Sequence, residues 1–313
     1  NPPGILDESF GGGDGIVTTD LGTSWDEAYA VAVQSDGKIV LAGRNATGLV
    51  VRRYTSHGVL DTTFGGGDGI VTTDVGAGTA DHARAVAIQA DGKIIVAGST
   101  SDSSPSDIAV LRYTSSGVLD PSFSGDGIQI TSPGTFDQGH ALAIQADGMI
   151  VVAGFSDADF VVLRYDDANG ALDSGFGTAG VVRTNIGTTD YAKAVAIQPA
   201  DQKIIAVGDS WNGSEYAFTA VRYLPDGTLD TTFDTDGIAA ANIIGVVDES
   251  ANAVVIQTDG RIVLAGHSHT ATQFALARLT ASGALDASFG DAGFAITAYE
   301  DSSIGEDVAL QSD

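Results

Sequence analysis

The sequence predicts an all-β protein, a β-propeller of four-stranded antiparallel blades. Three observations lead to this fold class: a repeat of 53 to 59 residues, a tight hairpin signal inside each repeat, and a composition rich in turn residues. The chain contains 41 glycines among 313 residues, which indicates many turns because glycine adopts backbone conformations that other residues avoid.

Two phrases mark the repeat. A Leu-Asp pair returns at residues 6–7, 60–61, 119–120, 172–173, 229–230 and 285–286. A second phrase reads AVAVQSDGKIVLAG from Ala30, and it returns from Ala85 and Ala141 and, more loosely, from Ala194 and Ala253. Self-similarity at this period predicts a propeller or a solenoid. We expect residues 1–313 to form one domain, with repeat units near 30–74, 85–131, 141–184, 194–241 and 253–297.

Each repeat holds four short β-type runs, which in the first repeat are 30–34, 38–43, 49–55 and 69–73. Asp-Gly between the first two runs predicts a tight hairpin, because it supplies the positive φ of a two-residue turn. The segment GVLDTTFGGGDG forms a longer corner before the fourth run. Small side chains place the first run innermost, and four antiparallel strands per repeat match a propeller blade.

These phrases resemble the delta-60 repeat family, whose pattern joins A-x-Q-x-D-G-K-I-x-x-A-G to R-Y…G-x-L-D-x-x-F-G, and the resemblance covers essentially the whole chain. It implies a propeller and a bacterial protein that is secreted or attached to the cell surface, but it implies no defined activity. One copy, QPADQK at residues 198–203, carries an insertion and lacks the turn glycine, which puts a single hairpin in doubt.

The strand count predicts a six-bladed ring whose last blade is incomplete. Residues 1–20 include an outer-type strand and residues 307–313 include an inner-type strand, so that blade would lack its two middle strands. Open strand edges invite pairing with another chain. Self-association through this blade, as in a surface filament, is therefore one alternative for the function.

Charge and composition exclude several classes of partner. The formal net charge is −27, and such a surface repels phosphate backbones and anionic lipids. We therefore expect no nucleic-acid partner, and the sequence has no apolar stretch long enough for membrane insertion. An acidic surface suits an extracellular or cell-surface location and divalent cations. The chain has no cysteine, which excludes disulfides and thiolate metal sites.

The repeated charges are expected to be scaffold. An arginine precedes the aspartate of each complete repeat's Leu-Asp pair by eight or nine residues, which predicts an ion pair within every blade. These arginines are Arg53, Arg112, Arg164, Arg222 and Arg278. No catalytic signature such as G-x-S-x-G or H-E-x-x-H occurs, so no catalytic residue is assigned.

Ligand-binding residues are expected where the repeats differ. The loops that enter the inner strand and those between the second and third strands vary, and antiparallel alternation places both at one end of the blades. Aromatic side chains among polar ones in such loops suit a sugar or a peptide, although they also pack loops. A further variable position lies five residues before each repeated Gln. The candidate ligand-binding residues are Trp25, Tyr29, Arg84, His140, Tyr191, Lys193, Trp211 and Asn252.

An acidic position lies eight residues before each repeated Gln. It is occupied by Asp26, Asp81, Asp137, Asp190 and Glu249. These carboxylates either cap their loops or form a ring that binds cations, in which case Ca²⁺ is the expected ion. No other cofactor is expected.

The leading functional hypothesis is a non-enzymatic binding or structural module, with adhesion as one role. Its expected ligand is a glycan, a peptide or a surface protein at the variable loops. The main alternative is a glycan hydrolase or lyase that uses the carboxylates of the acidic positions, which would require two of them at a fixed separation.

Overall fold

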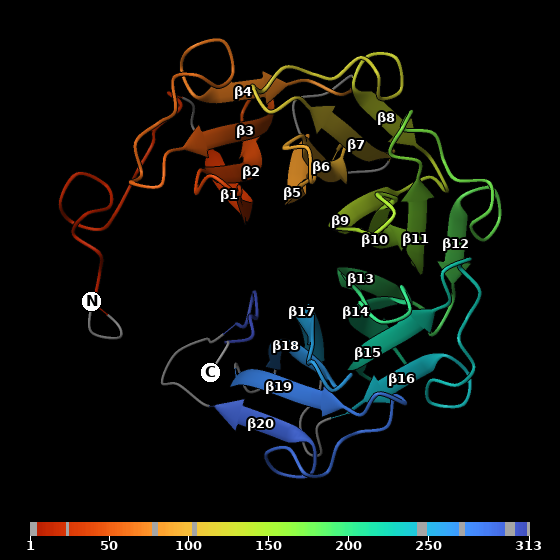
Figure 1. Cartoon of the computed structure of the whole chain (residues 1–313). Helices are drawn as coiled ribbons and strands as arrows, with labels where there is room; N and C mark the ends of the chain where they lie inside the picture. Colours follow the sequence, from red (N-terminus) through yellow and green to blue (C-terminus); the bar gives the residue numbers. More distant parts are fainter. Residues whose placement is uncertain are drawn as a thin grey trace. The chain divides into compact units, whose positions relative to one another are not determined.

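A computed structural model describes residues 5–22, 25–76, 81–101, 105–242, 249–268, 273–297 and 304–311 of the chain. In this part of the chain the structure consists of β-strands, turns and loops, without a helix. The strands form five four-stranded sheets, which we call blades 1 to 5, and in each blade the strands follow one another in chain order (Figure 1). The all-β propeller fold predicted from the sequence is confirmed.

The strands of each blade run from the innermost to the outermost position of the repeat. Blade 1 comprises β1 (Asp26–Val33), β2 (Ile39–Asn45), β3 (Gly48–Tyr54) and β4 (Ile70–Thr73). Blade 2 comprises β5 (His82–Ile88), β6 (Ile94–Ser99), β7 (Ile108–Tyr113) and β8 (Ile128–Thr131). Blade 3 comprises β9 (Asp137–Ile144), β10 (Ile150–Ser156), β11 (Asp159–Tyr165) and β12 (Val181–Thr184). Blade 4 comprises β13 (Asp190–Ile197), β14 (Ile204–Trp211), β15 (Tyr216–Tyr223) and β16 (Ile238–Ala241). Blade 5 comprises β17 (Glu249–Ile256), β18 (Ile262–Ser268), β19 (Gln273–Leu279) and β20 (Phe294–Thr297).

The chain divides into two compact units. Unit 1 contains Asn1–Leu142 and Asp167–Ala171, and unit 2 contains Ala143–Asp166 and Leu172–Asp313. In unit 1, Val40 and Leu49 of blade 1 pack against Val86 and Ile88 of blade 2. In unit 2, alternate apolar residues of blades 4 and 5 form an equivalent core. The period-two alternation of the strands therefore supplies one buried layer between blades 1 and 2 and another between blades 4 and 5.

The predicted arginine–aspartate ion pairs are confirmed in all five blades, and blade 2 shows their geometry. Arg112 Nε lies 2.9 Å from Asp120 Oδ2, and its guanidinium lies over the ring of Phe123 at 4.9 Å. Burial alone would raise the pKa of Asp120, but two hydrogen bonds from Ser122 and the charges of Arg112 and Lys93 lower it to about 2. The same pairing joins Arg53 to Asp61, Arg164 to Asp173, Arg222 to Asp230 and Arg278 to Asp286.

Four of these arginines also tie each blade to the next. The guanidinium donates a hydrogen bond to a backbone carbonyl in the turn after the third strand of the following blade. The pairs are Arg53 with Ser115, Arg112 with Asp167, Arg164 with Pro225 and Arg222 with Ala281. The repeated arginine therefore stabilises both its own corner and the contact between blades.

The predicted single strands of an incomplete sixth blade are not formed. Residues 5–20 and 307–311 belong to no strand, and residues 1–4 and 312–313 of this prediction lie outside the described residues. The N-terminal segment nevertheless contacts blade 1 in the same way as the outer strand of blade 1, β4, contacts blade 2. Thr19 Oγ1 lies 2.7 Å from the Tyr54 hydroxyl, as Thr73 Oγ1 does from that of Tyr113.

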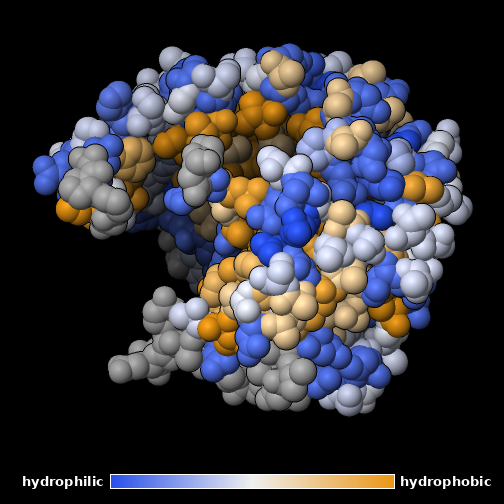
Figure 2. Space-filling model, turned by 60° about the horizontal axis from the view of Figure 1, so that its bottom comes forward, coloured by the Kyte–Doolittle hydropathy of each residue, from blue (hydrophilic) through white to orange (hydrophobic). Residues whose placement is uncertain are grey.

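On the face shown in Figure 2, both hydrophilic residues and broad patches of hydrophobic residues are exposed. No helix that could cross a bilayer occurs in the described part of the chain.

Candidate functional site

The inner strands of blades 1, 2, 4 and 5 each carry a β-bulge that presents one variable side chain. In blade 1, Ala28 pairs with Gly43 and Ala30 with Ala42, so Tyr29 is the extra residue. The bulge brings the inner strand so close that a Cβ on Gly43 would lie 1.9 Å from the Glu27 carbonyl oxygen. The repeated glycine is therefore required by the bulge. The bulged residues of blades 2, 4 and 5 are Arg84, Lys193 and Asn252.

An aromatic–arginine cluster surrounds the bulge of blade 1 in unit 1. We define it as Trp25, Glu27, Tyr29, Arg44, His82 and Arg84. Trp25 lies immediately before β1, and the register of β1 and β2 sets Glu27 opposite Arg44. The residue before the first strand and the end of the second strand thus meet at one end of blade 1.

Aromatic and cationic side chains alternate in this cluster. The Tyr29 ring stacks on His82 with 5.7 Å between centroids, and the Arg84 guanidinium lies 5.6 Å from the Tyr29 centroid. Arg44 lies at the same distance, 5.6 Å, from the Trp25 ring. Trp25 remains 62 % exposed and Tyr29 40 % exposed, whereas His82 is buried. The two exposed rings are therefore backed by buried or partly buried groups and accessible to a ligand.

Glu27 is held within the same cluster. Its Oε2 accepts a hydrogen bond from Arg44 Nε at 2.6 Å and another from the Tyr29 hydroxyl. These hydrogen bonds, first that of Tyr29 and then that of Arg44, lower the pKa of Glu27. Burial and the hydrogen bond to Glu27 raise the pKa of Tyr29 to about 12, so its hydroxyl is a donor at neutral pH. Arg44 Nη1 in turn lies 2.7 Å from His82 Nε2.

A lysine cluster occupies the equivalent position in unit 2. We define it as Lys193, Asp209, Ser250, Asn252 and His267. Lys193 Nζ lies 2.7 Å from Asp209 Oδ1 and 2.5 Å from Ser250 Oγ, and Ser250 Oγ donates to Asp209 at 2.9 Å. Asn252 Nδ2 donates to the Gly305 carbonyl at 2.9 Å. Because Asp209 and Ser250 are buried, this cluster is a packed polar network with little accessible surface.

The remaining predicted ligand-binding residues pack locally. Trp211 contacts the ring of Tyr216 at 5.0 Å within its own hairpin. Tyr191 meets Phe155 edge-on at 4.8 Å. His140 Nε2 lies 3.3 Å from Gln138 Oε1. The structure thus brings Trp25, Tyr29 and Arg84 of the predicted set together in one cluster, and Lys193 and Asn252 in the other.

The acidic positions cap the loops that enter the inner strands. Asp26, Asp81 and Asp137 accept hydrogen bonds from backbone N–H groups of their loops at 2.9 to 3.0 Å. Asp190 accepts two such groups, from Ile186 and Gly187. Asp81, Asp137 and Asp190 are fully buried, and Glu249 is 1 % exposed.

Burial has electrostatic consequences at these capping positions. It raises the pKa of Asp81 to about 6 against the effect of the hydrogen bond from Val75, and it also raises the pKa of Asp190. No three His, Asp or Glu side chains of the described residues gather as a metal-binding group. The calcium site stays a prediction, and melting temperatures with Ca²⁺ and with EDTA test it.

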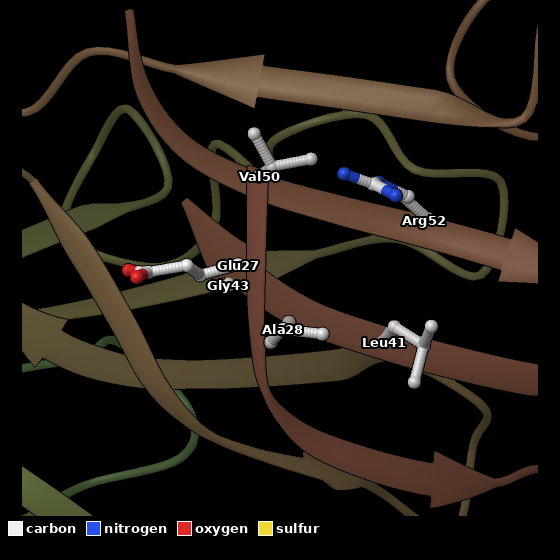
Figure 3. A pocket seen from close by; sticks show the side chains of 7 residues that line it. Glu27, Ala28, Leu41, Gly43, Val50 and Arg52 are labelled. Atoms are coloured by element: carbon white, nitrogen blue, oxygen red, sulfur yellow. The ribbon is translucent and has the colours of Figure 1, made fainter. Parts of the chain in front are cut away.

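A shallow pocket of about 10 Å³, room for about one water molecule, lies on one face of blade 1 (Figure 3). Ala28, Leu41, Val50 and Arg52 line it, and Figure 3 shows the Glu27 carboxylate extending to the side opposite Arg52. Ligand pockets for small molecules are commonly about 300 to 1,000 Å³. This pocket is too small to serve as the main site, so the exposed aromatic–arginine cluster is the better candidate.

Sequence reasoning missed Glu27, Asp209 and Ser250. Variation between the repeats could have found them. Asp209 directly follows the repeated glycine of the second strand, and Glu27 and Ser250 are the second residues of their inner strands. The former position holds Arg44, Ser99, Phe155, Asp209 and His267, which differ in every blade. The antiparallel register brings these two variable positions opposite each other, as for Glu27 and Arg44.

Comparison with known proteins identifies the repeat. The family model described as "Domain of unknown function (DUF5122) beta-propeller" matches residues 34–64, 89–123, 145–176, 200–233 and 257–289, just over half of the chain. This confirms the delta-60 type of repeat predicted from the sequence. No curated protein matches the chain.

Solved structures of other propeller-like proteins are similar only in fold. The PQQ-bound aldose sugar dehydrogenase of Streptomyces coelicolor is 12 % identical with a TM-score of 0.49, over 88 % of this chain and 80 % of that one. A gluconolactonase of Xanthomonas campestris is 13 % identical with a TM-score of 0.44, over 76 % and 68 %. The extracellular domain of a one-component system of B. thetaiotaomicron is 10 % identical with a TM-score of 0.48, over 94 % of this chain and 31 % of that one. This chain thus spans about a third of the last protein, and none of these similarities carries an argument about activity.

Proposed function

Because the chain belongs to the β-propeller family described as DUF5122, a family without an assigned activity, we propose that it is a non-enzymatic binding module. It holds a glycan, a peptide or a surface protein at the variable end of its blades, outside the cell or on the cell surface. Within this proposal the ligand contacts the aromatic–arginine cluster of unit 1.

One observation carries the proposal. Trp25 and Tyr29 are large rings that stay 62 % and 40 % exposed, although polar and cationic side chains fix their position from behind. Rigid aromatic rings with polar groups beside them supply contact area at low cost in conformational entropy. A glycan is favoured among the three ligand classes, because the flat apolar face of a pyranose ring stacks on an indole. The buried capping carboxylates are hydrogen-bonded to their loops, which supports binding over acid–base catalysis.

Titration calorimetry against a panel of oligosaccharides tests this function. We expect saturable binding to at least one glycan without release of products, and loss of that binding in Trp25→Ala. Trp211→Ala is the matched control, because its ring packs within a hairpin, and it should bind as the wild type does. Hydrolysis or elimination products would instead favour the glycan hydrolase or lyase.

Self-association is a second candidate function, favoured by the inner strand of blade 1. Val31 and Val33 are 59 % and 66 % exposed, whereas the equivalent Val86 and Ile88 of blade 2 are packed against blade 1. Exposed apolar strands of this kind pair with other chains. Light scattering over a range of concentrations tests this candidate. If the mean particle mass grows with protein concentration and Val31→Lys abolishes this growth, self-association is supported. A mass that stays at that of the monomer would exclude it.

A further inference from the structure

The distribution of positive charge singles out two arginines. Of 14 basic residues, nine serve the repeated corners: five corner arginines, and four residues that lie within 2.9 to 3.4 Å of a corner aspartate. Those four are Lys38, Lys93, Lys203 and Arg261. Outside the corners, Arg44 and Arg84 are the two that lie over the exposed aromatic rings. In a protein of net charge −27, these two guanidinium groups are therefore unusual in lying beside exposed aromatic rings.

The cluster already shows how it holds a carboxylate. The carboxylate of Glu27 is bound by Arg44 Nε and by the Tyr29 hydroxyl, and the Glu27 side chain is 43 % exposed. Arg44 is 15 % exposed and is positioned by its contact with His82, which is 2 % exposed. The two donors are therefore fixed by the fold, whereas the acceptor belongs to a solvent-exposed side chain. Hydrogen bonds between a guanidinium and a carboxylate are among the strong ones in proteins.

We propose that the ligand of this cluster is an acidic sugar, a uronic acid residue of an oligosaccharide. Its carboxylate takes the place of the Glu27 carboxylate between Arg44 and Tyr29, and its ring stacks on Trp25. This inference rests on the proposed binding function and names its ligand class. Long polyanions are disfavoured by the net charge of the protein, so the ligand is a short oligosaccharide with few carboxylates.

Glu27 then acts as an internal competitor. Its carboxylate occupies the two donors in the unliganded protein, and an incoming carboxylate must displace it. Glu27→Gln keeps the size of the side chain but removes the charge that attracts Arg44. Because an exposed ion pair contributes about 0.2 to 1 kcal/mol, this change should raise the affinity for an acidic sugar by a factor of about 1.4 to 5.

Calorimetry with two matched probes tests the inference. The probes are trigalacturonic acid and its methyl ester, which share ring and linkage but differ in charge. We expect the wild-type protein to bind the acid at least about tenfold more tightly than the ester, because a hydrogen-bonded charge is lost in the ester. Arg44→Gln should abolish this preference, and Glu27→Gln should increase it. Thermal melts of both variants establish that they fold.

The outcomes separate the inference from the function on which it rests. Equal affinity for acid and ester, or a preference that Arg44→Gln leaves unchanged, overturns the inference. If neutral sugars still bind and Trp25→Ala still removes that binding, the proposed function stands without the acidic ligand. If no oligosaccharide binds to the folded wild-type protein, both are wrong.

Discussion

At the scale of single residues, the buried arginine of each corner is the most sensitive position. Arg112 is 2 % exposed, and its removal would leave the buried Asp120 with its hydrogen bonds from Ser122 and with Lys93, 3.4 Å away, as its paired cation. Breaking a buried ion pair by deleting one partner costs about 3 to 5 kcal/mol. We therefore expect Arg112→Ala to lower the free energy of unfolding by about 3 kcal/mol in urea denaturation.

Arg278→Ala is the matched control for this prediction. The Arg278 side chain is 19 % exposed, and the second cation of Asp286, Arg261, lies 2.9 Å away, closer than Lys93 lies to Asp120. Its loss should cost clearly less than that of Arg112. Equal destabilisation by the two substitutions would show that the corners do not depend on a buried charge pair.

A second residue-scale prediction concerns Asp81 and pH. Burial raises the pKa of this carboxyl to about 6 in the folded protein, above its ordinary value of 3.8. Because the pKa of Asp81 is higher in the folded state, the protonated carboxyl contributes stability that is fully present below about pH 4. This contribution is lost as the pH rises through 6. The asparagine of Asp81→Asn cannot ionise. This variant should therefore lack the loss of stability between pH 4 and pH 6, which is at most about 3 kcal/mol.

Thermal unfolding of the two proteins at pH 5 and pH 8 measures this effect. The difference between the two pH values should be smaller in Asp81→Asn than in the wild type. If both proteins respond to pH equally, Asp81 does not titrate in this range.

At the scale of the element, the β-bulge of the inner strand depends on the glycine of the second strand that faces it. A Cβ on Gly98 would lie 1.6 Å from the His82 carbonyl oxygen, whereas one on Gly92 would meet only Ser115 Cβ at 3.7 Å. Gly92 adopts a φ of +84° in the hairpin turn, which costs another residue about 1 to 2 kcal/mol. Gly98→Ala should thus lower the free energy of unfolding by about 3 kcal/mol. Gly92→Ala should lower it by less. Comparable melting temperatures of the two variants would contradict the close approach of β5 and β6.

The hairpin that the sequence put in doubt is formed. Gln202 occupies the turn with a φ of +59°, and the bond from Gln198 N to the Lys203 carbonyl closes the turn at 2.8 Å. Gln202 Oε1 accepts a hydrogen bond from Ala146 N at 2.9 Å, which offsets the backbone strain. This compensation comes from a residue 56 positions away and could not be predicted from the turn itself.

The elements were predictable where the repeat fixes both strands and turn. The runs predicted for blade 1 agree with β1 to β4 within one or two residues at most ends, but β1 begins at Asp26, four residues before the predicted start. The bulge at Tyr29 was not predictable, because it depends on the register between β1 and β2, which the residues of β1 alone do not fix. Glu27 was missed for the same reason, since its partner Arg44 is fixed only by the register across that bulge.

At the scale of the whole molecule, the net charge of −27 sets the response to salt. Unscreened repulsion among like charges destabilises a compact protein, and added salt screens exposed charges more than buried ones. The corner ion pairs are largely buried and should be weakened little. We expect the melting temperature to rise between 10 mM and 300 mM NaCl. A fall in melting temperature would mean that exposed ion pairs contribute more to stability than repulsion removes.

The two tryptophans of the chain offer the most direct test of the division between repeated scaffold and variable binding residues. A protein labelled with ¹⁵N gives one indole N–H signal for Trp25 and one for Trp211, which single substitutions assign. During titration with trigalacturonic acid, the Trp25 signal should shift to saturation while the Trp211 signal stays in place. A shift of Trp211 alone, or binding measured by calorimetry without any shift of Trp25, would contradict this account.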